Sequence, residues 1–219
     1  MKFFRLIANV TLFFCLCHSV ALAARMVDDF EDGNIAKNPE WWKFGRLITD
    51  VVTNKGKAPK GETLGKRGLL IEGSTRNWYI GGLGTYLGID SSPYTHLELF
   101  ILGTGKDSGQ IKIELWDDDN KNWKAEADPK KDYSPIYDDI FTYALLVDWE
   151  GWKRVSIPLR DFTDNNPGVG NDAWDPQQLD GSGGLLQMSL VALGRGATGK
   201  IAVTLDEIKL SVPKTAEKK

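Results

Sequence analysis

Hydrophobic residues in this chain alternate with polar ones in short runs that Gly, Pro, Asn and Asp interrupt. A strand places successive side chains on opposite faces, so this alternation predicts strands, and no long run has the 3.6-residue period of a helix. The pattern therefore predicts an all-β fold, an antiparallel β-sandwich. The expected strands cover 26–31, 42–53, 68–73, 77–83, 94–103, 109–116, 141–149, 152–159, 186–194 and 200–211.

Two of these runs indicate their place in the sandwich. In 110–116 the residues Ile111, Ile113 and Leu115 share one face, which predicts burial, and Trp116 has the opposite parity and is expected on the outer face. The run 95–102 is apolar at both parities, which predicts a central strand that is covered on both faces.

The last strand changes its parity at Asp206-Glu207. A β-bulge at this point would keep both apolar sets inside the core and would re-aim Asp206. Without a bulge, one set must face outward or the strand must be covered on both sides. The first set is Ile201, Val203 and Leu205, and the second is Ile208 and Leu210.

Irregular segments separate some of the strands. The segments 117–139 and 161–184 are long for loops in one domain, and such loops usually carry function or mobility. The glycines of Gly81-Gly82-Leu83-Gly84 are expected to bend the chain out of a strand. The polar tail 214–219 is expected to be disordered, so the predicted domain is 24–213.

The first 23 residues have the pattern of a signal peptide. Lys2 and Arg5 precede an apolar run that is shorter than the about 20 residues of a membrane span, and Ala21-Leu22-Ala23 is a small-x-small cleavage site. We expect an exported, secreted or periplasmic protein without a membrane span. Cys15 and Cys17 both lie in this segment, so a disulfide and a thiolate site are excluded from the rest of the chain.

Charge and composition exclude other classes. Removing Lys2 and Arg5 lowers the cations from 27 to 25 against 30 acids, and the resulting net charge of −5 disfavours nucleic acid as a partner. His96, the only histidine after the signal, lies on a strand that is expected to be buried, and no G-x-S-x-G elbow occurs. About 195 residues suffice for one domain, which we expect to be a monomer and not an enzyme.

Acidic residues gather at both ends of the predicted domain. Asp29-Phe30-Glu31 lies near the start and Asp206-Glu207 near the end, and paired terminal strands would bring them together. Calcium would relieve the repulsion because it prefers several oxygen ligands, although solvated acids remain the alternative. The run 117–122 lacks the glycine and the final glutamate of an EF-hand, so a polar turn is the favoured interpretation.

Aromatic residues are the candidate ligand contacts. Flat rings pack well on the C–H faces of sugars, but a single Trp more often fills a core. Trp116 is the exception because of its outward parity. We predict that Trp116 stacks on a ligand with help from Tyr79, Trp123 or Trp174, which lie in or beside Gly-rich or polar loops.

Three segments resemble family 11 carbohydrate-binding modules and their relatives with a galactose-binding-like jelly roll. They are Val27-Asp28-Asp29-Phe30-Glu31-Asp32-Gly33, the stretch 152–162 (WKRVSIPLRDF) and the stretch 203–210 (VTLDEIKL). The resemblance implies a jelly roll, sugar binding on a sheet face or loop rim, and a structural calcium with Asp29, Glu31 and Asp206 as candidate ligands. The tyrosine-rich sugar cleft of the family does not map onto this chain.

The sequence thus predicts an exported, non-catalytic protein whose partner is a glycan or polysaccharide. One alternative is an assembly or scaffold protein with a protein partner, since the complex I intermediate-associated family shares a similar opening and the jelly roll. A small glycan-active enzyme is a further alternative, and it would need two carboxylates facing each other across a cleft, about 5–10 Å apart.

Overall fold

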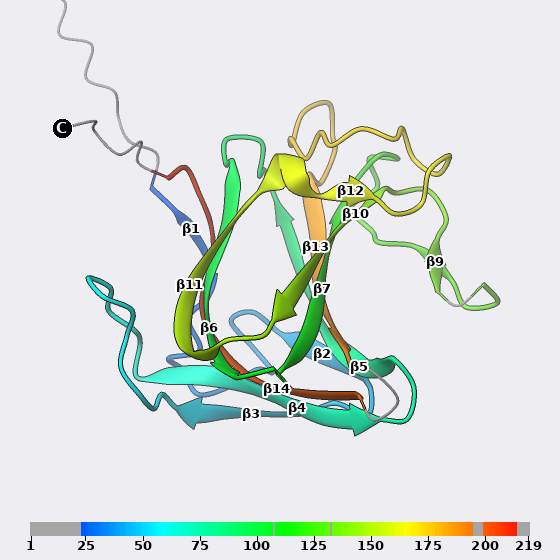
Figure 1. The fold of residues 1–219 in the computed structure, drawn as a ribbon. Helices are drawn as coiled ribbons and strands as arrows, with labels where there is room; N and C mark the ends of the chain where they lie inside the picture. Colours follow the sequence, from blue (N-terminus) through cyan, green and yellow to red (C-terminus); the bar gives the residue numbers. More distant parts are fainter. Residues whose placement is uncertain (1–22, 107, 132, 195–198, 214–219) are drawn as a thin grey trace, which may run out of the picture.

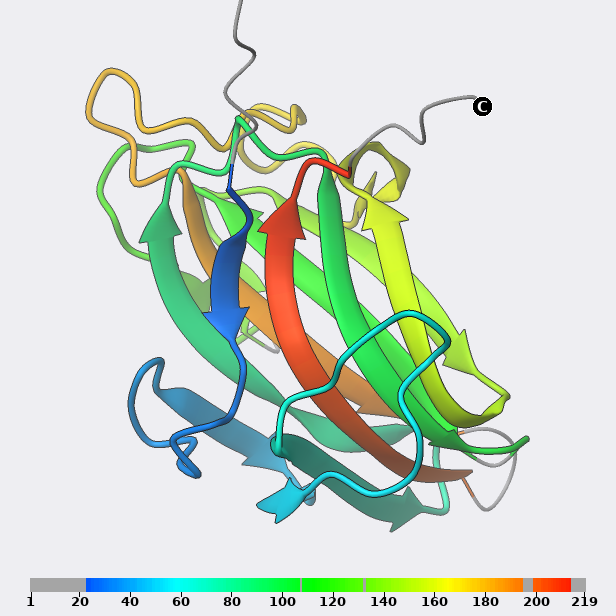
Figure 2. The same cartoon turned by 90° about the vertical axis from the view of Figure 1, so that its left-hand side faces the viewer.

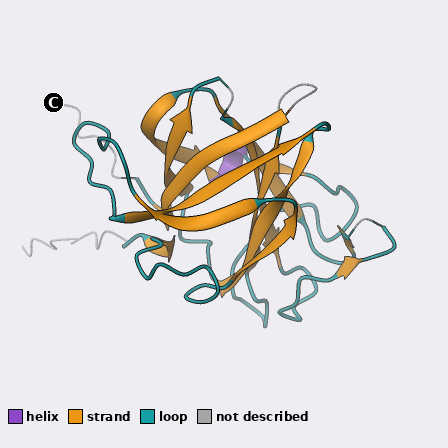
Figure 3. Ribbon diagram, turned by 90° about the horizontal axis from the view of Figure 1, so that it is seen from below, coloured by secondary structure: helices purple, strands orange, loops and turns teal. Residues whose placement is uncertain are grey.

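The computed structural model describes residues 23–106, 108–131, 133–194 and 199–213. The predicted signal peptide, apart from Ala23, and the predicted tail lie outside these ranges. Within them the chain forms strands and one short 3-10 helix, η1 (Leu159–Asp161), as Figure 3 shows. The all-β prediction is confirmed.

Two antiparallel sheets face each other across the core (Figure 1). The first, here called the β6 sheet, has the order β11-β6-β14-β4-β3, and β1 pairs with β14. Its strands are β1 (Arg25–Asp28), β3 (Ile48–Thr53), β4 (Arg67–Thr75), β6 (His96–Thr104), β11 (Glu150–Pro158) and β14 (Gly199–Ser211).

The second sheet, here called the β7 sheet, has the order β12-β10-β7-β13-β5-β2. Its strands are β2 (Trp41–Gly45), β5 (Tyr79–Ile89), β7 (Gly109–Asp117), β10 (Ile140–Val147), β12 (Thr163–Asp164) and β13 (Leu185–Leu193). A separate two-stranded pair, β8 (Ala127–Asp128) with β9 (Ser134–Pro135), interrupts the long segment between β7 and β10.

The two ends of the domain lie side by side, as the acidic clusters predicted. β1 pairs antiparallel with β14, with Arg25 opposite Leu210 (Figure 2). Burial of apolar side chains holds this pairing, because Phe30 directly after β1 and Ile208 on β14 are both fully buried in the common core. The first and last strands therefore close the sandwich together.

The predicted bulge in the last strand is present. The register between β14 and β6 shifts between Asp206 and Lys209, and Glu207 has a φ of 48°. The extra residue lets Leu205 and Ile208 both reach the core, where each is fully buried. The central position predicted for 95–102 is also confirmed, since β6 lies between β11 and β14.

Strand 42–53 and the bend at Gly81-Gly82-Leu83-Gly84 differ most from the prediction. The single strand expected over 42–53 is two strands in different sheets, because the chain turns after Gly45, whose φ of 73° favours glycine. The bend expected at Gly81-Gly82-Leu83-Gly84 is absent, and β5 continues through these residues to Ile89.

Candidate functional site

The outer face of the β6 sheet is covered by the loop 54–66, which crosses the sheet in Figure 2. The indole Nε1 of Trp152 on β11 donates to the carbonyl of Lys55, at 2.7 Å. The Arg154 guanidinium on the same strand donates to Glu62, with Nη1 3.0 Å from Oε1. These contacts dock the loop on the sheet, so this face offers little open surface.

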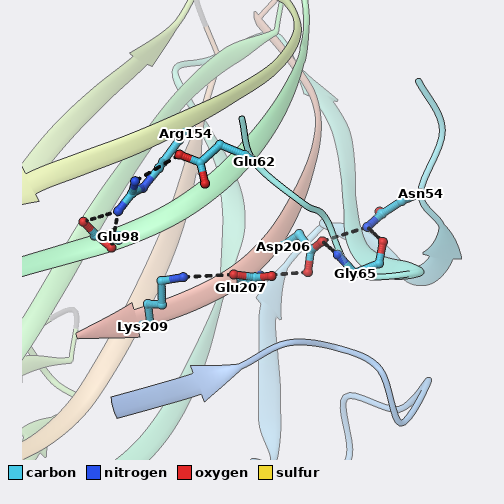
Figure 4. A network of polar contacts seen from close by, with 8 residues as sticks. All are labelled: Asn54, Glu62, Gly65, Glu98, Arg154, Asp206, Glu207 and Lys209. Atoms are coloured by element: carbon cyan, nitrogen blue, oxygen red, sulfur yellow. Dashed lines mark hydrogen bonds and ion pairs between the residues drawn. The ribbon is translucent and has the colours of Figure 1, made fainter. Parts of the chain in front are cut away.

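A buried carboxylate fixes the same region (Figure 4). Glu98 on β6 is 3% exposed and accepts two hydrogen bonds from Nη2 of Arg154, both at 2.9 Å. Ser156 donates to the same carboxylate at 3.2 Å. The hydrogen bonds with Glu98 raise the pKa of Arg154, and we interpret the pair as structural.

The outer face of the β7 sheet has a different composition, which follows from its register. One row of side chains crosses five strands as Trp42, Gly84, Ser189, Glu114 and Thr142. A neighbouring row holds Tyr86, Gln187, Trp116 and Ile140, and another holds Phe44, Gly82, Val191, Lys112 and Ala144. We call these three rows, with Tyr79 at the start of β5, the aromatic face.

Glycines of β5 make room for two rings of β2. A Cβ added at Gly84 would lie 2.5 Å from the Trp42 indole, and one added at Gly82 would overlap the Phe44 ring. Because Gly84 and Gly82 have no side chains, both rings can pack directly against the backbone of β5. This close approach explains why glycines occupy the middle of this strand. Trp42 nevertheless remains 39% exposed, so part of its ring is open to a ligand.

Polar groups lie beside these rings. Lys112 and Glu114 form an ion pair, with Nζ 2.7 Å from Oε1, and Gln187 donates to Ser189 at 3.1 Å. Burial, followed by the charge of Glu114, raises the pKa of Tyr79. The aromatic face thus combines apolar plates with hydrogen-bonding groups.

Trp116 occupies the predicted face but is buried. Its outward parity is confirmed by the pairing with Ile140 and Gln187, yet it is only 6% exposed, and so is Ile140. The segments that follow β7 extend along the side of the β7 sheet that faces away from β6 and β11 (Figure 1). The expectation of an exposed Trp116 is therefore corrected.

The other three predicted contacts have different environments. Trp174 is half-buried and packs edge-on against Phe141 of the core, with ring centroids 5.3 Å apart. Trp123 is exposed, and its carbonyl accepts a hydrogen bond from the hydroxyl of Tyr86 at 3.1 Å. Tyr79 is exposed at the opposite end of β5. Trp42 and Phe44 were not predicted, and the glycines of β5 were the signal that could have pointed to them.

The acids of the terminal strands converge on one glycine. Asp206 accepts hydrogen bonds from the N–H of Gly65 at 3.0 Å and from Asn54 at 2.8 Å, as Figure 4 shows. Glu31 accepts from the N–H of Arg67 at 2.9 Å. A Cβ at Gly65 would lie 2.5 Å from the Glu31 carboxylate and 3.3 Å from that of Asp206. Burial is the main cause that raises the pKa of Asp206 to about 6.

Asp29 lies apart from this arrangement. It is exposed, and its carboxylate accepts the N–H of Glu31 at 3.1 Å within a turn. In the ranges that the structure describes, Asp29, Glu31 and Asp206 do not form a group with three ligand atoms within 4.8 Å.

Other acidic side chains do form such groups. One consists of Asp117, Asp119 and Asp139, and a second joins Asp139 to Asp164 and Asp172. Burial, followed by the charge of Asp119, raises the pKa of Asp117 to about 8. Burial also raises the pKa of Asp119 to about 6. These residues could hold a metal ion by their geometry, and they lie at the ends of β7 and β12 and in the adjoining loops.

Comparison with solved structures supports the fold. The family 11 carbohydrate-binding module of a cellulosomal cellulase from Clostridium thermocellum is similar with a TM-score of 0.52 and 18% identity, over 90% of this chain and 99% of that chain. An exo-β-agarase is similar with a TM-score of 0.54 and 18% identity, over 88% of this chain and 25% of that chain. The resemblance to family 11 modules is thus confirmed for the fold, a jelly-roll sandwich.

A structure of the Clostridium thermocellum family 11 module in complex with a β-1,3-1,4-mixed-linked tetrasaccharide has a TM-score of 0.49 and 19% identity, over 87% of this chain and 96% of that chain. A scan of family models found no match to this chain. A search of curated proteins found none either.

Two further observations bear on the class of protein. Helices in the described ranges are too short and too polar to cross a membrane. Among the described side chains that the register places on the aromatic face, Glu114 is the single carboxylate, and Lys112 neutralises it. The two facing carboxylates that a glycosidase would need are not found on this face.

Proposed function

We propose that this protein is a non-catalytic carbohydrate-binding protein whose aromatic face binds a glycan. The observation that carries the proposal is the close packing of the Trp42 and Phe44 rings against Gly84 and Gly82, next to Ser189 and Glu114. Flat rings pack on the C–H faces of sugars, and the polar groups hydrogen-bond the hydroxyls. The similarity in fold to a carbohydrate-binding module supports it.

The dimensions of the face favour a chain over a single sugar. The row from Trp42 to Thr142 crosses five strands, which corresponds to roughly 19 Å at the usual strand spacing. Tyr79 and Trp123, two of the predicted contacts, lie near opposite ends of β5 and therefore on either side of this row. We infer that the ligand is an oligosaccharide or polysaccharide segment, bound weakly because an open face buries little area.

An interaction with a protein partner is the alternative use of this face. A large apolar patch without polar groups would favour it. The described part of the face instead places Gln187, Ser189, Glu114 and Lys112 between its aromatic and aliphatic residues. This mixture favours a polyhydroxylated ligand.

The predicted function extends to export and to a structural calcium. The pattern of the first 23 residues supports export to the periplasm or the medium. A calcium ion between Glu31 and Asp206 remains a prediction that the convergence of these two carboxylates on Gly65 supports, while Asp29, the third predicted ligand, lies apart from them.

Glycan-array binding followed by affinity electrophoresis tests the function. We expect Trp42→Ala to weaken binding by about tenfold, because loss of a stacking ring removes on the order of 1–2 kcal/mol. Tyr133→Ala is the matched control, since Tyr133 is exposed in the β8–β9 segment and is not part of the face. Equal binding of both variants and the parent protein would contradict the proposal.

A further inference from the structure

Three loop segments beside the aromatic face bring carboxylates together. Asp117 is the last residue of β7, Asp119 follows it, Asp139 precedes β10, and the loop after β12 closes around them. One carboxylate oxygen from each of Asp117, Asp119 and Asp139 lies within 4.8 Å of the others. The sequence suggested only a polar turn here, because Asp139 and the loop after β12 are distant in the chain.

Each of these carboxylates is held by the backbone through one oxygen. Oδ2 of Asp117 accepts the N–H of Asp175 at 3.2 Å, and Oδ2 of Asp119 accepts the N–H of Asp139 at 2.9 Å. Oδ2 of Asp139 accepts the N–H groups of Asn171 at 3.2 Å and Ala173 at 3.3 Å. The three side chains are therefore oriented by bonds that cross between the loops.

The second oxygen of each carboxylate has no partner. Oδ1 of Asp117, Asp119 and Asp139 is buried and accepts no hydrogen bond from the described residues. Asp117 is 1% exposed and Asp139 is fully buried, so water cannot solvate these two side chains freely. A buried carboxylate oxygen without a donor is expensive, and three of them close together repel one another.

Neighbouring protein groups do not neutralise this charge. Within the described ranges, the ion pairs of Lys and Arg involve other acids. The loop after β12 also lies close to these carboxylates. Gly170 in this loop cannot be a larger residue, because a Cβ there would overlap Oδ2 of Asp119 and Oδ1 of Asp139. The φ of Gly170 is 75°, which favours glycine.

We propose that Asp117, Asp119 and Asp139 bind one calcium ion, which cross-links the segments after β7, before β10 and after β12. The ligand set contains only oxygen, which suits a hard cation, and the remaining positions would be filled by waters or by Asp164 and Asp172, which lie close to Asp139. This site is distinct from the terminal-strand acids, with which it shares no residue.

The ion would also hold the loop that carries Trp123. Asp118, between two of the ligands, accepts the N–H of Trp123 at 3.1 Å and that of Gly183 at 2.6 Å. Calcium binding is therefore expected to order the segments 117–123 and 164–175 together.

Hydrogen exchange of the purified protein with chelator and with added CaCl2 tests the site. We expect calcium to protect amides in 117–123 and 164–175, and Asp119→Asn to weaken the calcium affinity measured through this protection about tenfold or more, because a charged ligand is lost. Asp206→Asn is the matched control and should leave this protection unchanged. Asp119 is the chosen position because it is the least buried of the three.

Two outcomes would overturn the proposal. One is identical exchange of these segments in the parent protein with and without calcium, which decides the question even where the variant fails to fold. The other is wild-type calcium affinity in a folded Asp119→Asn protein. Neither readout involves a glycan, so failure of the proposed function leaves this test intact.

Discussion

Trp116 packs inside the protein, although it points to the same side of the β7 sheet as the exposed Trp42. Burial of an indole contributes several kcal/mol through packing and exclusion of water. We expect Trp116→Ala to lower the free energy of unfolding by about 3 kcal/mol, measured by denaturant titration. Trp116→Phe should recover part of the loss, and a Trp116→Ala protein of unchanged stability would contradict this interpretation.

Strand β5 is the element that shapes the aromatic face, because its glycines leave space for the rings of β2. In Gly84→Ala the new methyl would lie 2.5 Å from the Trp42 indole and displace it, while the strand keeps its hydrogen bonds. We expect glycan binding to weaken and the thermal unfolding midpoint to change little. Retained binding with a displaced Trp42, seen in the tryptophan fluorescence, would count against the role of the ring.

The loop 54–66 depends on strand β11 through the ion pairs of Arg154. Arg154→Ala would leave the buried Glu98 carboxylate with Ser156 as its remaining donor, so we expect a loss of about 2 kcal/mol in stability. Arg160→Ala is the control, because its ion pair with Asp161 is exposed and should contribute less than about 1 kcal/mol. Chemical denaturation measures both, and equal losses would show that the burial of Glu98 is unimportant.

The whole molecule is closed by the pairing of its first and last strands, where Glu31 and Asp206 meet. An ion that binds only the folded state stabilises it, so calcium should raise the unfolding midpoint, and Asp206→Ala should remove the part due to this site. In the Asp119→Asn variant, calcium should still raise the unfolding midpoint through the site at Glu31 and Asp206. A midpoint that is the same with chelator and with calcium would contradict both predicted ions.

Much of the fold was predictable because strand parity is a local property. The alternation over 110–116 and the parity switch at Asp206-Glu207 both follow from side chains on opposite faces of a strand, and the acidic clusters at the two chain ends predicted that the terminal strands pair. The site was less predictable. Trp42 belongs to the aromatic face only because β2 pairs with the glycines of β5, and that partnership joins segments some 40 residues apart.

The order of polar and apolar residues by itself determined that this chain forms a sandwich with Ile113 and Leu205 inside, since hydrophobic burial selects the face of each strand. Which outward residues meet a ligand was decided by the tertiary structure. Loop 54–66 docks on one sheet, while on the outer face of the other sheet Trp42 stays exposed and Trp116 is buried. Exposure depends on what distant segments pack against a side chain, and parity along one strand does not contain that information.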